Sequence, residues 1–288
     1  MRYSNLHTHS LFCDGTDSIE TLCEKAAEKG FEILGFSSHA PLPKTSGLIS
    51  DWHMPEEKLP EYIDTVRKAR QRWNGKLKVF LGLEVDYIRG IMGPADPIYR
   101  SLGLDYIIGA VHYVRPPRGE PFTVDGPPRE LDRDVASGFG GDGSALMEAY
   151  WNALGEMIAA GGFNIIAHLD LIKKNNVGNR YFSPESPLYR SHTDNICRAV
   201  ARSGLLVEVN TGGWNRGAIA EVYPSGAILA ELRREKAPVL INSDAHAHKD
   251  LDGHYREARE ELLRAGYTGV MRLSENKNGM IEWAEDSL

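Results

Sequence analysis

The sequence predicts an α/β fold, a barrel in which parallel strands alternate with helices. Three observations lead to this fold class. Short apolar runs alternate with longer amphipathic runs along most of the chain. Several of the short runs are almost continuously apolar, which is typical of strands covered on both faces in a parallel sheet. Seven such strand–helix repeats within 288 residues favour a closed barrel over an open sheet.

The individual elements follow from these two kinds of run. The apolar runs predict strands over residues 3–7, 31–37, 78–85, 105–111, 163–167, 205–210 and 238–242. The amphipathic runs predict helices over residues 17–29, 55–73, 94–102, 144–161, 187–203, 225–236 and 254–265. Thr16, Asp17 and Ser18 are start signals for the first helix, and Gly30 follows its end. Glycine at such a position tolerates the left-handed conformation that closes a helix.

Two segments fall outside the repeat. Residues 113–143 are rich in Gly, Pro and charged residues, and we expect them to form a flexible, irregular loop over the active site. Residues 268–283 predict two short strands around the sequence Asn276-Lys277-Asn278-Gly279. We treat residues 1–288 as a single domain, because this length is common for one α/β barrel.

Composition excludes several classes of protein. The formal net charge of −7 shows no basic surface for nucleic acid. No apolar run approaches the roughly 20 residues that span a membrane, and the N-terminus has no signal sequence. Cys13, Cys23 and Cys197 are odd in number and lack the paired spacing of a metal site, so we expect reduced thiols and a cytoplasmic protein. The sequence does not indicate an oligomeric state.

Histidines and carboxylates stand where the predicted strands end, or in the loop that follows. These nine residues are His7, His9, Asp14, His39, Glu84, His112, His168, Asp244 and His246. The carboxyl ends of parallel strands share one mouth of a barrel, so these side chains should converge there. A single histidine at such a place is more often structural, and it is their joint recurrence that predicts a metal site. His53, His192, His248 and His254 are expected at the surface or in contact with a ligand side chain.

The kinds of side chain indicate which metals would bind. Six imidazoles and three carboxylates suit Zn, Mn or Fe, whereas Mg or Ca would prefer oxygen ligands alone. Nine ligands are too many for one tetrahedral ion, and they fit two or three ions with Glu84 as a bridge. Such ions would make the cavity cationic in spite of the acidic net charge, because bound cations dominate the local field.

An ordered set of motifs resembles the polymerase-and-histidinol-phosphatase (PHP) superfamily, and within it the histidinol-phosphate phosphatases. The motifs are NLHTHSLFCDG, LGFSSHAPLP, LGLEVDY, IIGAVHYV, IIAHLDLIKK, EVNTGGWNRG with EVYPS, and INSDAHAHKD. They extend from Asn5 to the last motif, and the resemblance reaches about Trp283. The segment after His112 departs from the family pattern, as does Lys173, where many relatives carry arginine.

The resemblance implies a distorted seven-stranded barrel with three metal ions. It assigns His7, His9, Glu84 and Asp244 to the first metal, and Glu84, His112 and His168 to the second. It assigns Asp14, His39 and His246 to the third metal, and Lys173 and Arg216 to the phosphate of the substrate.

The implied reaction is hydrolysis of a phosphate monoester. A hydroxide between metals, held by His7, His9, Glu84, His112, His168 and Asp244, would attack phosphorus without a protein nucleophile. The implied substrate is L-histidinol phosphate, converted to L-histidinol and inorganic phosphate in histidine biosynthesis. Three alternatives stay open: a PHP enzyme for another small phosphate ester or nucleotide, an amidohydrolase-type barrel, and an inert metal-binding module.

Overall fold

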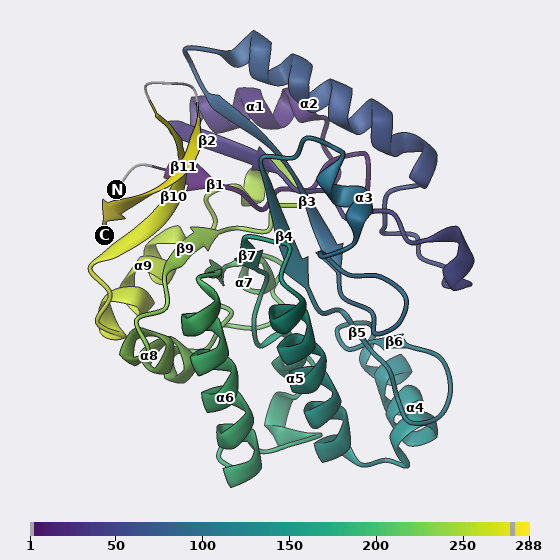
Figure 1. Ribbon diagram of the computed structural model, residues 1–288. Coiled ribbons are helices and arrows are strands. Elements are labelled where there is room, and N and C mark those ends of the chain that lie inside the picture. Colours follow the sequence, from purple (N-terminus) through teal and green to yellow (C-terminus); the bar gives the residue numbers. More distant parts are fainter. Residues whose placement is uncertain (1–2, 277–279) are drawn as a thin grey trace.

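In a computed structural model of the chain, seven parallel strands form one sheet in the order β1-β2-β3-β4-β7-β8-β9 (Figure 1). The structure is described for residues 3–276 and 280–288. The strands are β1 (Tyr3–Asn5), β2 (Phe31–Phe36), β3 (Lys78–Asp86), β4 (Tyr106–Ala110), β7 (Ile165–Ile166), β8 (Leu206–Asn210) and β9 (Val239–Asn242).

The sheet closes into a barrel just beyond the ends of its two edge strands. A parallel bridge joins Thr8, after β1, to Ala245, after β9. In this bridge Ala245 N donates to His7 O at 3.1 Å, and His9 N donates to Ala245 O at 2.8 Å. The predicted barrel of seven strands is therefore confirmed, and its closure lies at the end that carries the predicted ligands.

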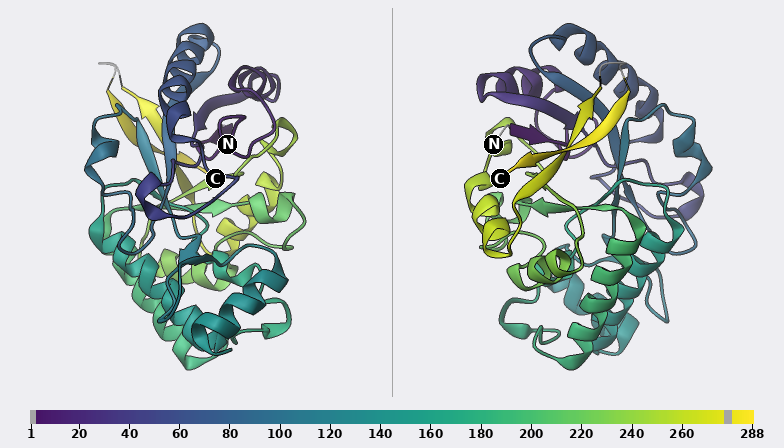
Figure 2. Two further views of the ribbon diagram at one scale, coloured as in Figure 1. Left: turned by 90° about the vertical axis from the view of Figure 1, so that its right-hand side faces the viewer. Right: turned by 60° about the vertical axis from the view of Figure 1, so that its left-hand side comes forward.

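The helices lie outside the strands (Figure 2). They are α1 (Ile19–Glu28), α2 (Leu59–Trp73), α3 (Pro97–Arg100), α4 (Pro128–Phe139), α5 (Gly143–Ala160), α6 (Pro187–Ser203), α7 (Gly212–Asn215), α8 (Gly226–Arg234) and α9 (Tyr255–Arg264). Short 3-10 helices are η1 (Lys44–Ser46), η2 (Glu56–Lys58), η3 (Leu171–Lys173), η4 (Val177–Asn179) and η5 (His248–Asp250). In the described part of the chain, no helix combines the length and apolarity needed to cross a membrane.

The first helix illustrates how local sequence makes these elements. Ser18 caps α1, because its hydroxyl oxygen accepts a hydrogen bond from Thr21 N at 3.1 Å. Its buried residues Ile19, Leu22, Cys23 and Ala26 have helical spacing and form one apolar face. This face packs against the strands, where α1 contacts β2.

Inside the barrel, alternate strand residues form a second, smaller core. It consists of Leu6, Ile33, Phe80, Tyr106, Ile108, Ala110, Ile165, Ala167, Leu206, Leu240 and Leu273. Tyr106 fills the space left by two glycines: a Cβ on Gly82 would lie 2.5 Å from Tyr106 Cζ, and one on Gly35 would lie 2.4 Å from its Oη. The Tyr106 hydroxyl is within hydrogen-bond distance of Leu6 O at 2.5 Å.

A C-terminal hairpin covers the end of the barrel that lies away from the predicted ligands. Its strands are β10 (Gly269–Glu275) and β11 (Ile281–Ser287), and they pair antiparallel. Leu273 is buried in the barrel core, and Met271 and Trp283 pack against that core. Figure 1 shows the hairpin lying across this end of the strands. The two predicted strands are confirmed, with β11 extending to Ser287. The predicted turn at residues 277–279 lies outside the described residues.

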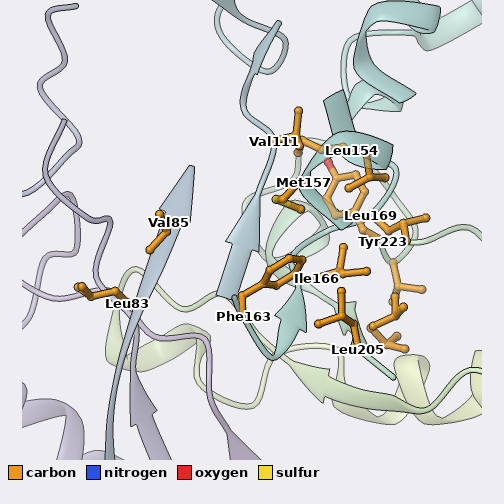
Figure 3. Close-up of a cluster of buried hydrophobic side chains, with 14 of the residues drawn as sticks. Leu83, Val85, Val111, Leu154, Met157, Phe163, Ile166, Leu169, Leu205 and Tyr223 are labelled. Carbon is orange, nitrogen blue, oxygen red and sulfur yellow. The ribbon is translucent and has the colours of Figure 1, made fainter. Parts of the chain in front are cut away.

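The larger core lies between the strands and the helices. Figure 3 shows part of it, where Leu154 and Met157 of α5 face Val111, Phe163 and Ile166. Nine residues of the helix α5 are buried, so this helix is enclosed along much of its length.

The prediction of an irregular loop over residues 113–143 is wrong. This segment forms a small hairpin, β5 (Tyr113–Val114) with β6 (Phe122–Thr123), and then the helix α4. Pro128 occupies the first turn of α4, where its missing N–H costs no hydrogen bond. Leu131 and Val135 are buried one turn apart. That spacing was visible in the sequence, but the density of Gly and Pro obscured it. The predicted helix 94–102 is also shorter than expected, since only Pro97–Arg100 is helical.

Candidate metal centre

The nine predicted ligand residues converge at the mouth of the barrel. Within the described residues, four overlapping groups of ionisable side chains could each hold a metal ion. They are His7, His9 and Glu84; Glu84, His112 and His168; His9, Asp14, His39 and His246; and His39, Asp86 and His112. The first three groups correspond to the three sets that the family resemblance implied, except that the first group lacks Asp244. His9 differs, because it also belongs with Asp14, His39 and His246.

Glu84 lies at the centre of the cluster, in β3, and is 1% exposed. Its Oε2 lies 3.1 Å from His7 Nε2 and 3.0 Å from His39 Nδ1. Its Oε1 faces the other side, 3.1 Å from His168 Nε2 and 3.8 Å from His112 Nε2. The two oxygens of one carboxylate therefore reach different histidines, as a bridging ligand would.

Asp244 and Asp14 complete the cluster, and both contact His9 and His246. Asp244 Oδ1 lies 3.1 Å from His9 Nε2 and 3.6 Å from His7 Nε2. Asp14 Oδ2 lies 3.0 Å from His246 Nε2. Asp244 has a φ of +49°, a left-handed conformation that non-glycine residues seldom adopt outside functional sites.

Several atoms that face the middle of the cluster are buried without a hydrogen-bond partner among the described residues. They include His7 Nε2, His9 Nε2, Asp14 Oδ1, His39 Nδ1 and Glu84 Oε2. Buried polar atoms normally find a partner, because leaving one unpaired costs about 1–3 kcal/mol. A divalent cation would satisfy these converging nitrogen and oxygen lone pairs at once, so the donor set fits transition-metal ions.

The electrostatics of the cluster keep its carboxylates ionised. Burial would raise the pKa of Glu84, but His39 and His7 hold it well below its usual value. Burial opposes ionisation of Asp244 as well, and Arg216 and His7 nevertheless lower its pKa well below the usual value. Burial lowers the pKa of His9 to about 3, aided by His246 and His39. A neutral imidazole and ionised carboxylates are the forms that bind metals.

Two buried carboxylates outside the predicted set hold ligand histidines from behind. Glu208 Oε2, in β8, lies 2.9 Å from His7 Nδ1. Asp86 Oδ1, in β3, lies 2.8 Å from His112 Nδ1. Sequence reasoning assigned no role to either, although an acidic residue inside an otherwise apolar strand was the available signal. His53 is also buried, and its Nε2 lies 2.9 Å from Asp86 Oδ2.

Comparison with known proteins identifies the family. The model of the PHP domain matches residues 5–212. The chain belongs to the PHP domain family. Two of its relatives are a probable histidinol-phosphatase of Deinococcus radiodurans, 30% identical over 90% of this chain and 92% of that protein, and the histidinol-phosphatase of Bacillus subtilis, 25% identical over 86% of this chain and 95% of that protein.

Solved PHP domain structures have the same fold. A Listeria monocytogenes protein assigned as a histidinol phosphatase has a TM-score of 0.81 at 21% identity, covering 88% of this chain and 99% of its own. The histidinol phosphate phosphatase of Lactococcus lactis, solved with Zn, L-histidinol and phosphate, has a TM-score of 0.65 at 20% identity, covering 98% and 99%. At these identities the likeness shows the fold.

In this PHP domain the cluster forms one wall of a cavity of about 530 Å³. Arg216 lines the cavity, with its Nη2 3.0 Å from Asp244 Oδ2. Lys174 also lines it and donates to Asp125 O at 2.9 Å. Lys173 does not line it: its Nζ donates to Val222 O at 2.8 Å. The structure thus brings Arg216 to the cluster, and it brings Lys174 rather than the expected Lys173 to the cavity.

Proposed function

We propose that this chain is a metal-dependent phosphate monoester hydrolase. We propose L-histidinol phosphate as its substrate, with L-histidinol and inorganic phosphate as products, which would place it in histidine biosynthesis. We further propose that residues 1–288 act as one catalytic domain. The observation that carries the proposal is the cluster of ligand-type residues, seven of which line a cavity that also contains Arg216 and Lys174.

The donor set supports two or three divalent ions of Zn, Mn or Fe, held by His7, His9, Asp14, His39, Glu84, His112, His168 and His246. Asp244, whose Oδ1 lies 3.1 Å from His9 Nε2, would be a further ligand. When bound, such ions act as Lewis acids that yield a nucleophile from water near neutral pH and offset the charge of a phosphoryl group. Zn has a precedent in the Lactococcus lactis structure.

The residues of this chain would bind and orient the phosphate. Arg216 is held against the cluster, because its Nη1 donates to Asp244 O at 2.9 Å and its Nη2 contacts the Asp244 carboxylate. A guanidinium fixed in this way presents its remaining N–H groups to a phosphate oxygen. Lys174, whose Nζ lies 3.1 Å from Asp125 Oδ2, supplies a second positive charge at the same cavity.

Other lining residues suit a cationic organic group. Asp14, Glu84 and Asp244 belong to the cluster, and Asp125 is paired with Lys174. Two further carboxylates in the lining, those of Asp51 and Glu130, form no hydrogen bond or ion pair within the described part of the chain. Trp52 provides an aromatic wall beside them. An ester that carries an ammonium and an imidazole complements this lining better than a polyanionic nucleotide does.

The decisive experiment measures phosphate release from L-histidinol phosphate by protein loaded with Zn or Mn. We expect a higher kcat/KM than for p-nitrophenyl phosphate or nucleoside monophosphates. Preference for a nucleotide would assign the chain to another branch of the phosphoesterases. Metal binding without phosphate release from any ester would make it an inert metal-binding module.

A further inference from the structure

Glu208 belongs to none of the metal groups described above, yet it is fully buried beside one of the ligand histidines. We propose that Glu208 is a positioning residue that fixes the tautomer of His7, so that the Nε2 lone pair faces the metal centre. This inference rests on the metal centre proposed above, and it concerns a residue that lies outside that centre.

Glu208 is surrounded by hydrogen-bond donors. Its Oε1 accepts from His168 N at 2.8 Å and from Asn210 Nδ2 at 2.6 Å. Its Oε2 accepts from Asn242 Nδ2 at 2.9 Å and lies 2.9 Å from His7 Nδ1. Both oxygens therefore carry two contacts each, and a backbone N–H is among the donors.

The two amide groups cannot turn round to become acceptors. Asn210 Oδ1 accepts a hydrogen bond from Gly212 N at 2.8 Å, which leaves its Nδ2 to face Glu208. Asn242 Oδ1 accepts from Leu6 N at 2.8 Å, which fixes its orientation in the same way. An ionised carboxylate is the group that can accept from all of these donors.

The state of His7 follows from this arrangement. Because a carboxylate only accepts, the His7 Nδ1 carries the hydrogen and donates it to Glu208. In the neutral imidazole that a metal requires, the lone pair is then on Nε2, which lies 3.1 Å from Glu84 Oε2 and has no hydrogen-bond partner among the described residues. Histidines that bind metals usually donate their other ring N–H in this manner.

Asp86 contacts His112 in a similar way, but its surroundings can adjust. Its Oδ1 accepts from His112 N at 3.2 Å, and its Oδ2 lies 2.9 Å from His53 Nε2. On the far side, His53 Nδ1 lies 2.8 Å from Ser50 Oγ. A serine hydroxyl can donate or accept, so His53 can exchange its tautomer if the group at position 86 changes.

These networks predict different results for the same chemical change. In Glu208→Gln, the amide oxygen of the new side chain can take the place of Oε1 and accept from His168 N and Asn210 Nδ2. Its NH2 group then faces Asn242 Nδ2 and His7 Nδ1. His7 then accepts at Nδ1 and carries its hydrogen on Nε2, where a metal would bind. With Asp86→Asn, the amide oxygen can stay on His112 while His53 accepts from the new NH2. Asp86→Asn is therefore the comparison variant: it removes the same charge beside a ligand histidine without changing the tautomer of that ligand, although Asp86 itself belongs to one of the metal groups.

The test is a Zn²⁺ titration of the metal-free protein against a chromophoric chelator, together with the Zn content after dialysis and the Zn-dependent shift in Tm. For Glu208→Gln we expect Zn affinity to fall by about 10–100-fold in at least one site, and for Asp86→Asn by less than about tenfold. Wild-type affinity in a folded Glu208→Gln variant would overturn the proposal. A loss in Glu208→Gln no larger than that in Asp86→Asn would also overturn it, because a ligand in the wrong tautomer should cost more affinity than the loss of a charge beside a ligand.

A second variant keeps the test decisive if Glu208→Gln does not fold. In Glu208→Gln/Asn242→Asp, the new aspartate can accept from the glutamine NH2 and still accept from Leu6 N. The double variant has the charge of the wild type, and the glutamine NH2 no longer faces the NH2 group of Asn242. His7 Nδ1, however, still faces an NH2 group. We expect it to fold and to stay weak in Zn binding, and recovery of wild-type affinity would refute the tautomer argument. Failure of the wild-type protein to bind Zn would instead refute the metal centre itself.

Discussion

At the scale of single residues, Glu84 has the most contacts within the proposed centre. Its Oε2 faces His7 and His39, and its Oε1 faces His168. We expect Glu84→Ala to abolish phosphate release, because it removes the carboxylate shared by two groups of ligands. The chain should still fold, since the substitution also removes a buried charge.

The measurement is phosphate release together with a thermal melt and the metal content of the variant. Glu156→Ala is a suitable control, because Glu156 pairs with Arg89 on the outer face of α5. It should retain wild-type turnover. Near-wild-type activity in Glu84→Ala would remove the proposed centre, and Asp244→Ala should behave as Glu84→Ala does.

The sequence and the structure point to different lysines at the cavity. Lys174 lines the cavity, whereas Lys173 is directed to Val222 O, with Asp170 Oδ2 3.1 Å away. We expect Lys174→Gln to lower kcat/KM for phosphate esters by about tenfold, as a charged hydrogen bond contributes about 1.5–3 kcal/mol. Lys173→Gln should lower Tm and largely preserve kcat/KM. The opposite pattern in steady-state kinetics would restore Lys173 to the phosphate site.

The sequence could place the nine ligand candidates because each stands at or just after the end of a strand, and parallel strands bring these ends together. It could not choose between Lys173 and Lys174. They lie at the end of a 3-10 turn, and the direction of each side chain depends on contacts with Asp125 and Val222, which are distant in the sequence. The same holds for Glu208, because three of its four donors, those of His7, His168 and Asn242, come from parts of the chain distant in the sequence.

At the scale of elements, the fit of β3 against β4 depends on the absence of a side chain at Gly82. A Cβ there would lie 2.5 Å from the ring of Tyr106, which is fully buried. We expect Gly82→Ala to lower the free energy of unfolding by about 1–3 kcal/mol through overpacking. Chemical denaturation of both proteins measures this difference.

A glycine on α5 provides the control. A Cβ on Gly155 would meet Ile196 Cδ1 at 3.5 Å, an ordinary contact. Alanine in a helix interior is favoured over glycine by about 0.5–1 kcal/mol, so Gly155→Ala should be neutral or stabilising. Equal destabilisation by both substitutions would contradict the packing argument for Tyr106.

The elements that the sequence predicted best are long and amphipathic. The helix predicted over 187–203 is observed as α6 with the same bounds. By contrast, β7 is only two residues long, although its apolar run suggested five, because its pairing with β4 and β8 is short. Helix α4 was missed because its apolar face is small, with Leu131 and Val135 as its buried residues.

At the scale of the whole molecule, the centre draws ligands from both ends of the sequence, including His7 and His246. Bound metals would therefore stabilise the closure of the barrel as well as the site. Each site filled at about 100 times its Kd adds about 2.7 kcal/mol to stability. In a chain of 288 residues, that corresponds to a rise in Tm of roughly 4–5 °C for each site.

We therefore expect a chelator to lower Tm by at least several degrees and added Zn²⁺ to restore it, as measured by scanning calorimetry. Glu84→Ala should show a smaller response to the chelator. An unchanged Tm in the wild-type protein after its metal has been shown to be removed would contradict the link between metal binding and barrel closure.

The hairpin of β10 and β11 has a practical consequence. The start of β1 and the end of β11 lie close together at this covered end of the barrel (Figures 1 and 2). A reporter domain or a surface anchor attached at either end would point away from the cavity, so the immobilised enzyme would keep its entrance open to substrate. The same proximity would permit a short linker to join the two ends, with new ends opened in an exposed loop.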